Sequence, residues 1–238
     1  MVVTMPAHIG IVGCSAEGAA LCYVTICIEA GEVFGTYVHP EVSMHTHSLA
    51  EYMPHIARGD WPAVGELMLS SARKLAGAGA EFLVCPDNTI HQAMPYVVPR
   101  SPLPWLHIAE VVADRAAVTG FRRLGLTGTR SLVDSDVYPD TLAARGLECV
   151  KPSAVERDAV DRVIFEELVN GVFTQEAVTC FQQVIERLKA EGCDAVVLGC
   201  TEIPLVMNDS NSPLPTLDST RLLARAALRR AVELRRPG

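Results

Sequence analysis

The feature that most constrains the fold is an internal repeat whose period is about half the chain. A short β-branched run ends in a glycine turn at Gly13, and a similar run, RLGLTGT at 123–129, ends in a second one. A strand-like run followed by a polar turn occurs at Asp87 and again at Cys200. Gly128 lies 115 positions after Gly13, and Cys200 lies 113 positions after Asp87, so both landmarks recur at nearly one period.

Each half alternates buried strands with amphipathic helices, such as the helical stretch from Ser15 to Ala30 and one of about fifteen residues that runs to Arg145. Such alternation indicates right-handed βαβ units and parallel sheets covered on both faces. The predicted fold class is therefore α/β, with two pseudo-symmetric doubly wound domains, each a mainly parallel sheet flanked by helices. Ligands bind outside the carboxyl ends of such strands, which places the expected active site in a cleft between the domains.

A proline-rich stretch, YVVPRSPLPW, indicates the boundary between the halves, and strand 106–108 and helix 109–119 lead into the second. The final segment has the cap and spacing of a helix, and we expect it to pack back onto the first half. The first domain is therefore predicted to comprise residues 1–103 with the helix 219–238, and the second residues 104–218.

Composition excludes several classes of protein. With 49% hydrophobic residues, 20% charged residues and a formal charge of −8, the chain has the profile of a globular protein without an electrostatic footprint for nucleic acid or an anionic membrane. No apolar run is long enough to span a bilayer, and the first residues lack the features of a signal peptide. We expect a cytoplasmic protein that binds neither nucleic acid nor membrane.

The spacing of the cysteines and glycines indicates neither a structural metal nor a bound nucleotide. The eight cysteines include no C-x-x-C pair and mostly lie in apolar runs, so they are expected to be reduced thiols without a structural metal. The turn Gly13 to Gly18 matches G-x-x-x-x-G, but Ala19 and Ala20 stand where a nucleoside triphosphate site needs Lys and Ser or Thr. The dinucleotide spacing is also missing. No cofactor is predicted.

Two turns carry side chains suited to acid–base chemistry. Asp87 follows the strand EFLVC, and Cys200 follows the strand AVVLG, each ahead of an expected helix whose free amides stabilise a thiolate or a bound carboxylate. Two facing groups suit removal of a proton from one face of a carbon and its return on the other, which inverts a stereocentre. The alternative for Asp87 is a helix cap, and the usual role of a buried cysteine is packing.

Further candidates line the same turns. Asn88, with the threonine hydroxyls, is expected to hold a substrate carboxylate, and Glu202 to anchor an amine or hold the turn. Ser15 has a helix cap as its alternative role, His45 and His47 follow an expected strand, and His91 either orients Asp87 or packs. The predicted substrate-binding residues are Ser15, His47, Asn88, Thr89, Thr129, Thr201 and Glu202.

Five motifs together resemble the aspartate/glutamate racemase family. They are GCSAEG near the start, PDNTIH at 86–91, GLTGTRSLVDSDVYPDTLAARGLE at 125–148, GCTEIPL at 199–205 and LDST at 217–220. The resemblance spans nearly the whole chain and implies two pseudo-symmetric α/β domains, a two-base mechanism without pyridoxal phosphate, and a homodimer. It also matches Ser15 and Thr129 to positions that contact substrate in relatives.

The chain departs from the family pattern at the first catalytic position. Relatives have Pro-Cys-Asn-Thr-x-His there, whereas Asp87 replaces the cysteine, and Cys85 lies two residues too early to substitute for it. An Asp carboxyl has a pKa of about 3.9, against about 8.5 for a Cys thiol, but burial and a nearby carboxylate raise it. Asn170 lies in a region where some relatives place a substrate-binding lysine.

The sequence therefore predicts a cofactor-independent isomerase, an amino-acid racemase or epimerase that acts on aspartate, glutamate or a related small carboxylate through Asp87 and Cys200. Two alternatives stay open. One is a decarboxylase or cis-trans isomerase of a small diacid that uses Cys200 alone. The other is a carboxylate-binding relative without catalysis.

Overall fold

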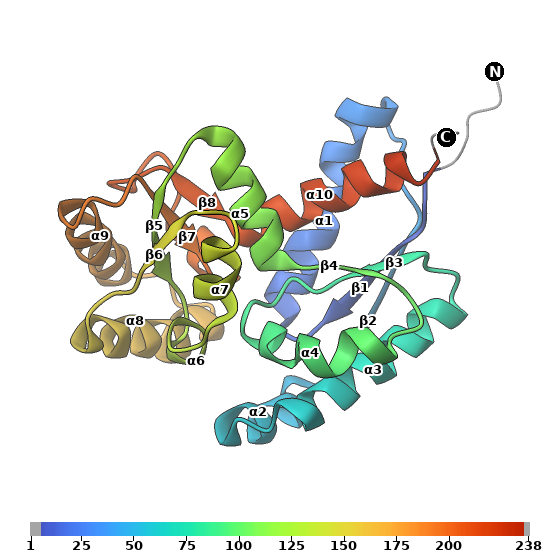
Figure 1. Cartoon of the computed structure of the whole chain (residues 1–238), viewed down its shortest axis with the longest axis horizontal. Coiled ribbons are helices and arrows are strands. Elements are labelled where there is room, and N and C mark those ends of the chain that lie inside the picture. The colour runs from blue at the N-terminus through green and yellow to red at the C-terminus, as the bar shows by residue number, and fades with distance from the viewer. Residues whose placement is uncertain (1–5, 236–238) are drawn as a thin grey trace. The chain divides into compact units, whose positions relative to one another are not determined.

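The computed structural model describes residues 6–235, which are drawn with their elements in Figure 1. The chain divides into two compact units. Unit 1 contains the chain up to Ile108 and the segment from Thr220 onward, and unit 2 is Ala109–Ser219. The sequence prediction placed these divisions after 103 and after 218.

Unit 1 is built on a four-stranded sheet in the order β2-β1-β3-β4, in which every neighbouring pair is parallel. Its strands are β1 Ile9–Gly13, β2 Val42–Thr46, β3 Phe82–Val84 and β4 Trp105–Leu106. Its helices are α1 Ala16–Phe34, α2 Leu49–Arg58, α3 Trp61–Gly77, α4 Met94–Val97 and α10 Ser219–Glu233, with 3₁₀ turns η1 Thr89–Ala93 and η2 Val98–Arg100. Figure 1 shows α1 and α10 on one face of the sheet and α2, α3 and α4 on the other.

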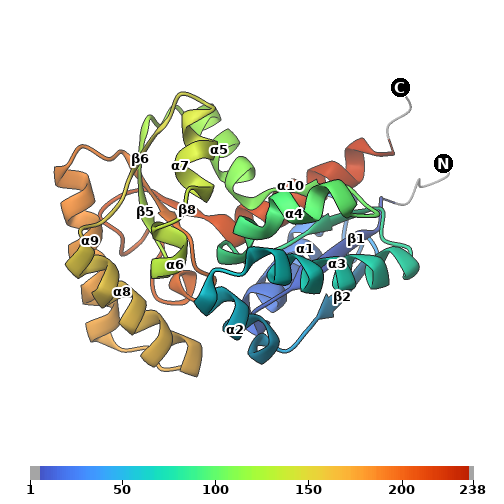
Figure 2. The same cartoon turned by 60° about the horizontal axis from the view of Figure 1, so that its bottom comes forward.

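Unit 2 repeats the same topology, with the parallel order β6-β5-β7-β8. Its strands are β5 Arg123–Thr127, β6 Glu148–Val150, β7 Ala195–Leu198 and β8 Thr216–Asp218. Its helices are α5 Ile108–Thr119, α6 Arg130–Val133, α7 Val137–Ala143, α8 Ala154–Glu166 and α9 Gln175–Ala190, with 3₁₀ turns η3 Leu168–Asn170 and η4 Ile203–Leu205. In Figure 2, α8 and α9 lie together on one face of this sheet.

The predicted fold class is confirmed. Both sheets are entirely parallel, helices cover them, and the strand orders match position by position, so the repeat read from the sequence is a repeat of topology. The two units also exchange their last helices. Nearly all of α5 follows β4 of unit 1 but belongs to unit 2, while α10 follows β8 of unit 2 and, apart from Ser219, belongs to unit 1.

One predicted helix is broken in two. The stretch that runs to Arg145 forms α6 and α7 with an interruption at 134–136. There the Ser135 hydroxyl donates to the Leu132 carbonyl at 2.6 Å and accepts from the Val137 amide at 3.4 Å. Serine competes in this way with helical hydrogen bonds, which explains the break.

Each unit has its own apolar core. Tyr52, Met68 and Phe82 are fully buried in unit 1, and Tyr138 and Phe181 are fully buried in unit 2. Within residues 6–235, none of the helices has the length and apolar character required to cross a membrane.

Gly199 allows the end of β7 to approach β5 closely. Its amide donates to the Thr127 carbonyl at 2.8 Å, and a Cβ atom at this position would lie 2.6 Å from that same oxygen and 2.7 Å from Leu132 Cδ2. Only glycine fits here without moving the backbone of β5. The turn that carries Cys200 is therefore held against the turn that carries Thr129.

We expect Gly199→Ala to lower the free energy of unfolding by about 1–3 kcal/mol, because the added methyl group overlaps a backbone oxygen. Gly77→Ala is the matched control: its Cβ would meet nothing within 4 Å, and replacing a helical glycine should stabilise by about 0.5–1 kcal/mol. Urea unfolding followed by circular dichroism measures both. A Gly199→Ala protein with wild-type stability would show that the close approach does not constrain the turn.

Candidate active site

The strand order places the predicted catalytic turns at equivalent points of the two units. The chain leaves β1 to form β2 on one side and then returns to form β3 on the other, and β5, β6 and β7 repeat this path. The carboxyl ends of β1 and β3, and likewise of β5 and β7, are therefore neighbours. Such a switch point is where open α/β sheets bind ligands.

In unit 1 this point lies between the turns of Ser15 and Asp87. Asp87 is partly buried, and its Oδ1 accepts a hydrogen bond from the Ile90 amide at 3.2 Å. Asn88 is 2% exposed and Thr89 is partly buried. The carboxylate thus has the capping contact that the alternative interpretation predicted, and it also lies where the sheet places a ligand.

The His91 side chain connects the backbone of the Asp87 turn to that of Ile108. Its Nδ1 lies 2.7 Å from the Asp87 carbonyl, and its Nε2 accepts from the Ile108 amide at 3.3 Å, so the ring is neutral with its proton on Nδ1. Burial lowers the pKa of His91 well below its usual range, and the His107 ring, 4.6 Å away, lowers it further. Of the two roles predicted for His91, the structure shows the orienting one, through the backbone of Asp87.

Cys85 lies in surroundings that disfavour a thiolate. It is fully buried, and burial, with the nearby Asp87 charge, raises the pKa of its thiol well above the usual range. The buried Tyr52 lies in the same region: burial raises its pKa, and Cys14, Cys85 and Asp87 raise it further. The interior behind Asp87 therefore disfavours any further negative charge.

In unit 2 the switch point lies between the turns of Thr129 and Cys200. Cys200 is 9% exposed, and its Sγ donates a hydrogen bond to Glu202 Oε2 at 2.8 Å. Glu202 is 3% exposed and Thr201 is 4% exposed. The Cys200 thiol therefore has a carboxyl group as hydrogen-bond acceptor within its own turn, which the sequence did not predict.

Ser219 supports the same turn. Its hydroxyl is buried and donates to the carbonyl of Leu198, the last residue of β7, at 2.8 Å. The sequence indicated only a helix cap there. The bond fixes the strand end two residues before Cys200.

The expectation of a helix N-terminus at the Cys200 turn was wrong. Cys200 precedes η4, which has three residues, whereas Asp87 precedes η1, which has five residues and runs directly into α4. Pro204 lies in η4, and a short 3₁₀ turn carries little aligned dipole. The electrostatic environment of the Cys200 thiol therefore comes from neighbouring side chains, above all the Glu202 carboxyl group, and not from a helix dipole.

Ser15 and Thr129 occupy equivalent cap positions. Ser15 Oγ accepts from the Gly18 amide at 3.3 Å, and Thr129 Oγ1 accepts from the Leu132 amide at 3.3 Å. Both hydroxyls lie at the switch points, and both make the contact expected of a simple cap.

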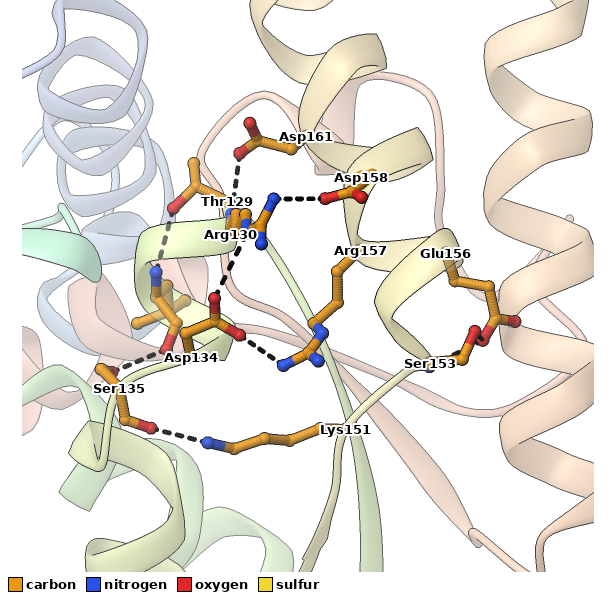
Figure 3. A network of polar contacts seen from close by, with 11 residues as sticks. Thr129, Arg130, Asp134, Ser135, Lys151, Ser153, Glu156, Arg157, Asp158 and Asp161 are labelled. Carbon is orange, nitrogen blue, oxygen red and sulfur yellow. Dashed lines mark hydrogen bonds and ion pairs between the residues drawn. The ribbon is translucent and has the colours of Figure 1, made fainter. Parts of the chain in front are cut away.

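Figure 3 shows the polar network that anchors the Thr129 turn. The Arg130 amide donates to Asp161 at 2.7 Å, and the Arg130 guanidinium donates to Asp158 at 2.6 Å. Both carboxylates belong to α8, so these bonds connect α8 to the first residue of α6. Arg130 also contacts Asp134 at 3.4 Å, and Arg157 pairs with the same carboxylate. Nearby on the same side, Lys151 donates to the Ser135 carbonyl at 2.9 Å.

Three other predicted positions have structural partners. His47 Nε2 lies 3.1 Å from Ser70 Oγ, and His45 lies between Ser71 and Lys74, with 2.9 Å to each. Asn170 donates to the carbonyls of Phe165 and Glu166 and so ends α8. His47 is one residue beyond β2, beside the end of β1.

Residues 6–235 contain no group of three or more His, Cys, Asp or Glu side chains that could hold a metal ion.

Comparison with known proteins assigns this arrangement to a family. The family model for Asp/Glu/Hydantoin racemase matches residues 24–227. This match, together with two parallel α/β units of matching strand order, defines a two-domain α/β protein of the racemase class. The chain belongs to the Asp/Glu/Hydantoin racemase family.

Individual proteins and solved structures that resemble this chain are described as racemases or racemase homologues. The chain is 23% identical to the broad specificity amino-acid racemase RacX of Bacillus subtilis over 169 residues, which are 71% of this chain and 73% of that protein. A solved structure of a candidate Asp/Glu racemase from Yersinia pestis is similar, with a TM-score of 0.87 and 30% identity, covering 95% of this chain and 99% of the other. An aspartate racemase homologue from Pyrococcus horikoshii has a TM-score of 0.82 and 28% identity, covering 94% and 99%.

We expect His91→Gln to lower the free energy of unfolding by about 1–3 kcal/mol at pH 8, because the buried Ile108 amide loses its acceptor. The unfolded chain protonates this histidine near pH 6.5, whereas the folded protein keeps it neutral, so wild-type stability should fall by up to about 1.4 kcal/mol per pH unit below pH 6.5. The variant should lose that slope.

Urea unfolding at intervals from pH 8 to pH 5 tests this expectation, with His39→Gln at an exposed position as the matched control. Equal slopes in wild type and His91→Gln would contradict a neutral, buried His91.

Proposed function

We propose that this protein is a cofactor-independent amino-acid racemase or epimerase in which Cys200 and Asp87 exchange protons with the substrate α-carbon. The observation that carries the proposal is the buried pair of Cys200 and Glu202 at the end of β7, since the thiol already donates toward a carboxylate. Membership of the racemase family supports the reaction type.

The proposed chemistry starts with transfer of the Cys200 proton to Glu202. The thiolate then removes the α-proton from one face of the substrate, and a carboxylic acid at Asp87 donates a proton to the opposite face. The products are the inverted amino acid, a Cys200 thiol, a Glu202 carboxylic acid and an Asp87 carboxylate. The reverse direction uses Asp87 as the base and Cys200 as the acid, and proton exchange with solvent returns Glu202 and Asp87 to their starting states.

Polar side chains at the two switch points would stabilise the charge that develops when the α-proton leaves. Asn88, Thr89, Thr129 and Thr201 provide amide and hydroxyl groups for the substrate carboxylate. Ser15 and His47 complete the proposed contacts in unit 1. The substrate class is aspartate, glutamate or a related small carboxylate, in line with the racemases that resemble this chain.

One observation favours a second candidate function. Asp87 Oδ1 is engaged with the Ile90 amide, as expected of a cap. If capping is its whole role, Cys200 is left as the single acid, which suits a decarboxylase or a cis-trans isomerase of a small diacid.

The first test is proton NMR of D- and L-aspartate, D- and L-glutamate and a small amino-acid panel in deuterated water. We expect loss of the α-proton signal with the wild-type protein and the opposite enantiomer on chiral chromatography. Cys200→Ala should lower the rate of racemisation at least about 100-fold, because it removes one proton-transfer group.

Cys193→Ala is the matched control, since Cys193 lies just before β7 whereas Cys200 follows it. It should retain activity. Silence of the wild-type protein across the panel, followed by loss of carbon dioxide or double-bond isomerisation with small diacids, would replace the racemase proposal by the second candidate.

Asp87→Asn separates the two mechanisms. With two bases, the variant should stop racemisation yet still exchange the α-proton of the one enantiomer that faces Cys200. Glu202→Gln should slow exchange of that same enantiomer about 10- to 100-fold, because Cys200 loses its proton acceptor. Enantiomer-resolved deuterium incorporation measures both effects. Full racemisation by Asp87→Asn would exclude Asp87 as a base.

A further inference from the structure

Cys14 is a buried thiol beside the candidate active site that the proposed reaction does not use. It directly follows β1, the strand whose carboxyl end lies at the switch point of unit 1. Its side chain is 4% exposed and belongs to an apolar cluster that also contains Tyr52 and Cys85. The turn that carries Cys14 entered the proposed reaction only through Ser15.

The register of the sheet sets Cys14 opposite Asp87. Ile11 of β1 pairs with Val84 of β3, an offset of 73 positions, and the two pairs before it share this offset. Continued past the strand ends, the same offset pairs Cys14 with Asp87. Neighbouring strands lie about 4.8 Å apart, and side chains at paired positions of parallel strands point to the same face. The thiol and the carboxyl group therefore lie within reach of each other.

Unit 2 supports the continuation of such an offset beyond the strand ends. There the last pair of β5 and β7 has an offset of 71 positions. One position further, a Cβ atom on Gly128 would lie 3.2 Å from the Gly199 carbonyl oxygen, so the residues after the last pair are still in contact. Two positions further, the same offset pairs Thr129 with Cys200. Unit 1 has the same strand order, so the equivalent turns of its sheet are expected to meet in the same way.

The titratable side chains around Asp87 favour neutral forms. Tyr52 of α2 and Cys85, which follows β3, stay protonated because burial raises the pKa of each. His91 of η1 is neutral because burial lowers its pKa. Cys14 lies in the same apolar surroundings, which favour a thiol over a thiolate. A thiol donates a hydrogen bond and a carboxylate only accepts, so the two groups are complementary.

The Asp87 carboxylate has room for a further donor. Its Oδ1 accepts from the Ile90 amide at 3.2 Å. A carboxylate has two oxygens and about four acceptor sites, so this single bond does not saturate it. The Ile90 amide belongs to η1, whereas Cys14 belongs to the β1 turn. Donors from two separate elements would restrict the orientation of the carboxylate more than one donor does.

Each unit then has one thiol and one carboxyl group at its switch point, with their burial reversed. In unit 2 Cys200 is 9% exposed and Glu202 is 3% exposed. In unit 1 the Cys14 thiol is the more buried group, and Asp87 is only partly buried. The more accessible group of each pair, Cys200 in one unit and Asp87 in the other, is the one assigned to proton transfer.

We propose that Cys14 is a positioning residue for Asp87, with its thiol donating a hydrogen bond to the Asp87 carboxylate across the switch point of unit 1. The bond stabilises the carboxylate and aligns it with the substrate. Unit 2 has the converse pair, in which the Glu202 carboxyl group accepts from the Cys200 thiol. The inference rests on the proposed function, because it assigns a partner to one of the two proton-transfer groups, but the bond itself is measurable without substrate.

A carbon NMR titration of the full chain, isotope-labelled at the aspartate side-chain carboxyl groups, tests the bond. Asp87→Asn identifies the Asp87 signal by its absence. Cys14→Ala should raise the pKa of Asp87 by about 0.5 units or more, because the carboxylate loses a donor. Cys14→Ser, whose hydroxyl also donates, should keep this pKa at or below the wild-type value. Cys22→Ala removes a fully buried thiol of α1 and is the matched control, which should leave the Asp87 pKa unchanged.

Infrared spectroscopy measures the same bond from the side of the thiol. The S–H stretching band of Cys14 is obtained as the difference between the wild-type protein and Cys14→Ser. The same difference in the background of Asp87→Asn should place the band at higher frequency, because a neutral amide oxygen is a weaker acceptor than a carboxylate. This measurement decides the question even if Cys14→Ala does not fold.

Enantiomer-resolved deuterium exchange separates the inference from the proposed function. In Cys14→Ala the kcat/KM profile of the enantiomer that faces Asp87 should move to higher pH by the shift found in the titration. The enantiomer that faces Cys200 should exchange within about 2-fold of the wild-type rate, whereas a merely structural defect would slow both.

The outcomes are distinct. A wild-type protein without exchange would refute the racemase proposal, while the titration and the infrared band would still decide whether Cys14 binds Asp87. An Asp87 pKa that does not rise in Cys14→Ala, a Cys14 band that is the same with Asp87→Asn, or equal slowing of both enantiomers would each overturn the role of Cys14.

Discussion

Both candidate catalytic turns depend on one constraint, the parallel pairing of the first strand of each half with the third. β1 pairs with β3, and β5 pairs with β7, although the second strand lies on the opposite side in each sheet. This crossing leaves two post-strand turns side by side with no crossover helix between them. In unit 2 the absence of a side chain at Gly199 permits the approach, because a Cβ atom would overlap the Thr127 carbonyl.

Around these turns, buried polar groups have fixed partners. His91 joins the Asp87 carbonyl to the Ile108 amide, and Ser219 joins the last carbonyl of β7 to α10. Glu202 is buried beside Cys200 and accepts a hydrogen bond from its thiol. Such groups are costly to bury unless they are hydrogen-bonded, so each bond also restricts the orientation of its turn. Pre-oriented donors and acceptors are what proton transfer at carbon requires.

Because the two units exchange their last helices, α10 contributes contacts to unit 1. Because most of α10 packs in unit 1, its Arg225 binds Glu29 on α1 and its Ala231 carbonyl accepts from the Ala7 amide. An exposed ion pair of this kind contributes about 1 kcal/mol or less, so it adds little to the apolar packing that holds α1 in unit 1. With one side of α1 packed into unit 1, its other side exposes Tyr23, Val24 and Ile28.

The sequence alone determined the repeat, the parallel α/β class and the turns that bear Asp87 and Cys200, because strand and helix periodicities and turn residues are local properties of the chain. It also identified the family through GCTEIP and the motifs around it. Only the tertiary structure decided that Glu202 accepts a hydrogen bond from the Cys200 thiol, that His91 is neutral, and that a three-residue 3₁₀ turn rather than a helix follows Cys200. Those features depend on burial and on contacts between residues distant in sequence, such as His91 with Ile108 and Gly199 with Thr127, whose energies no local pattern encodes.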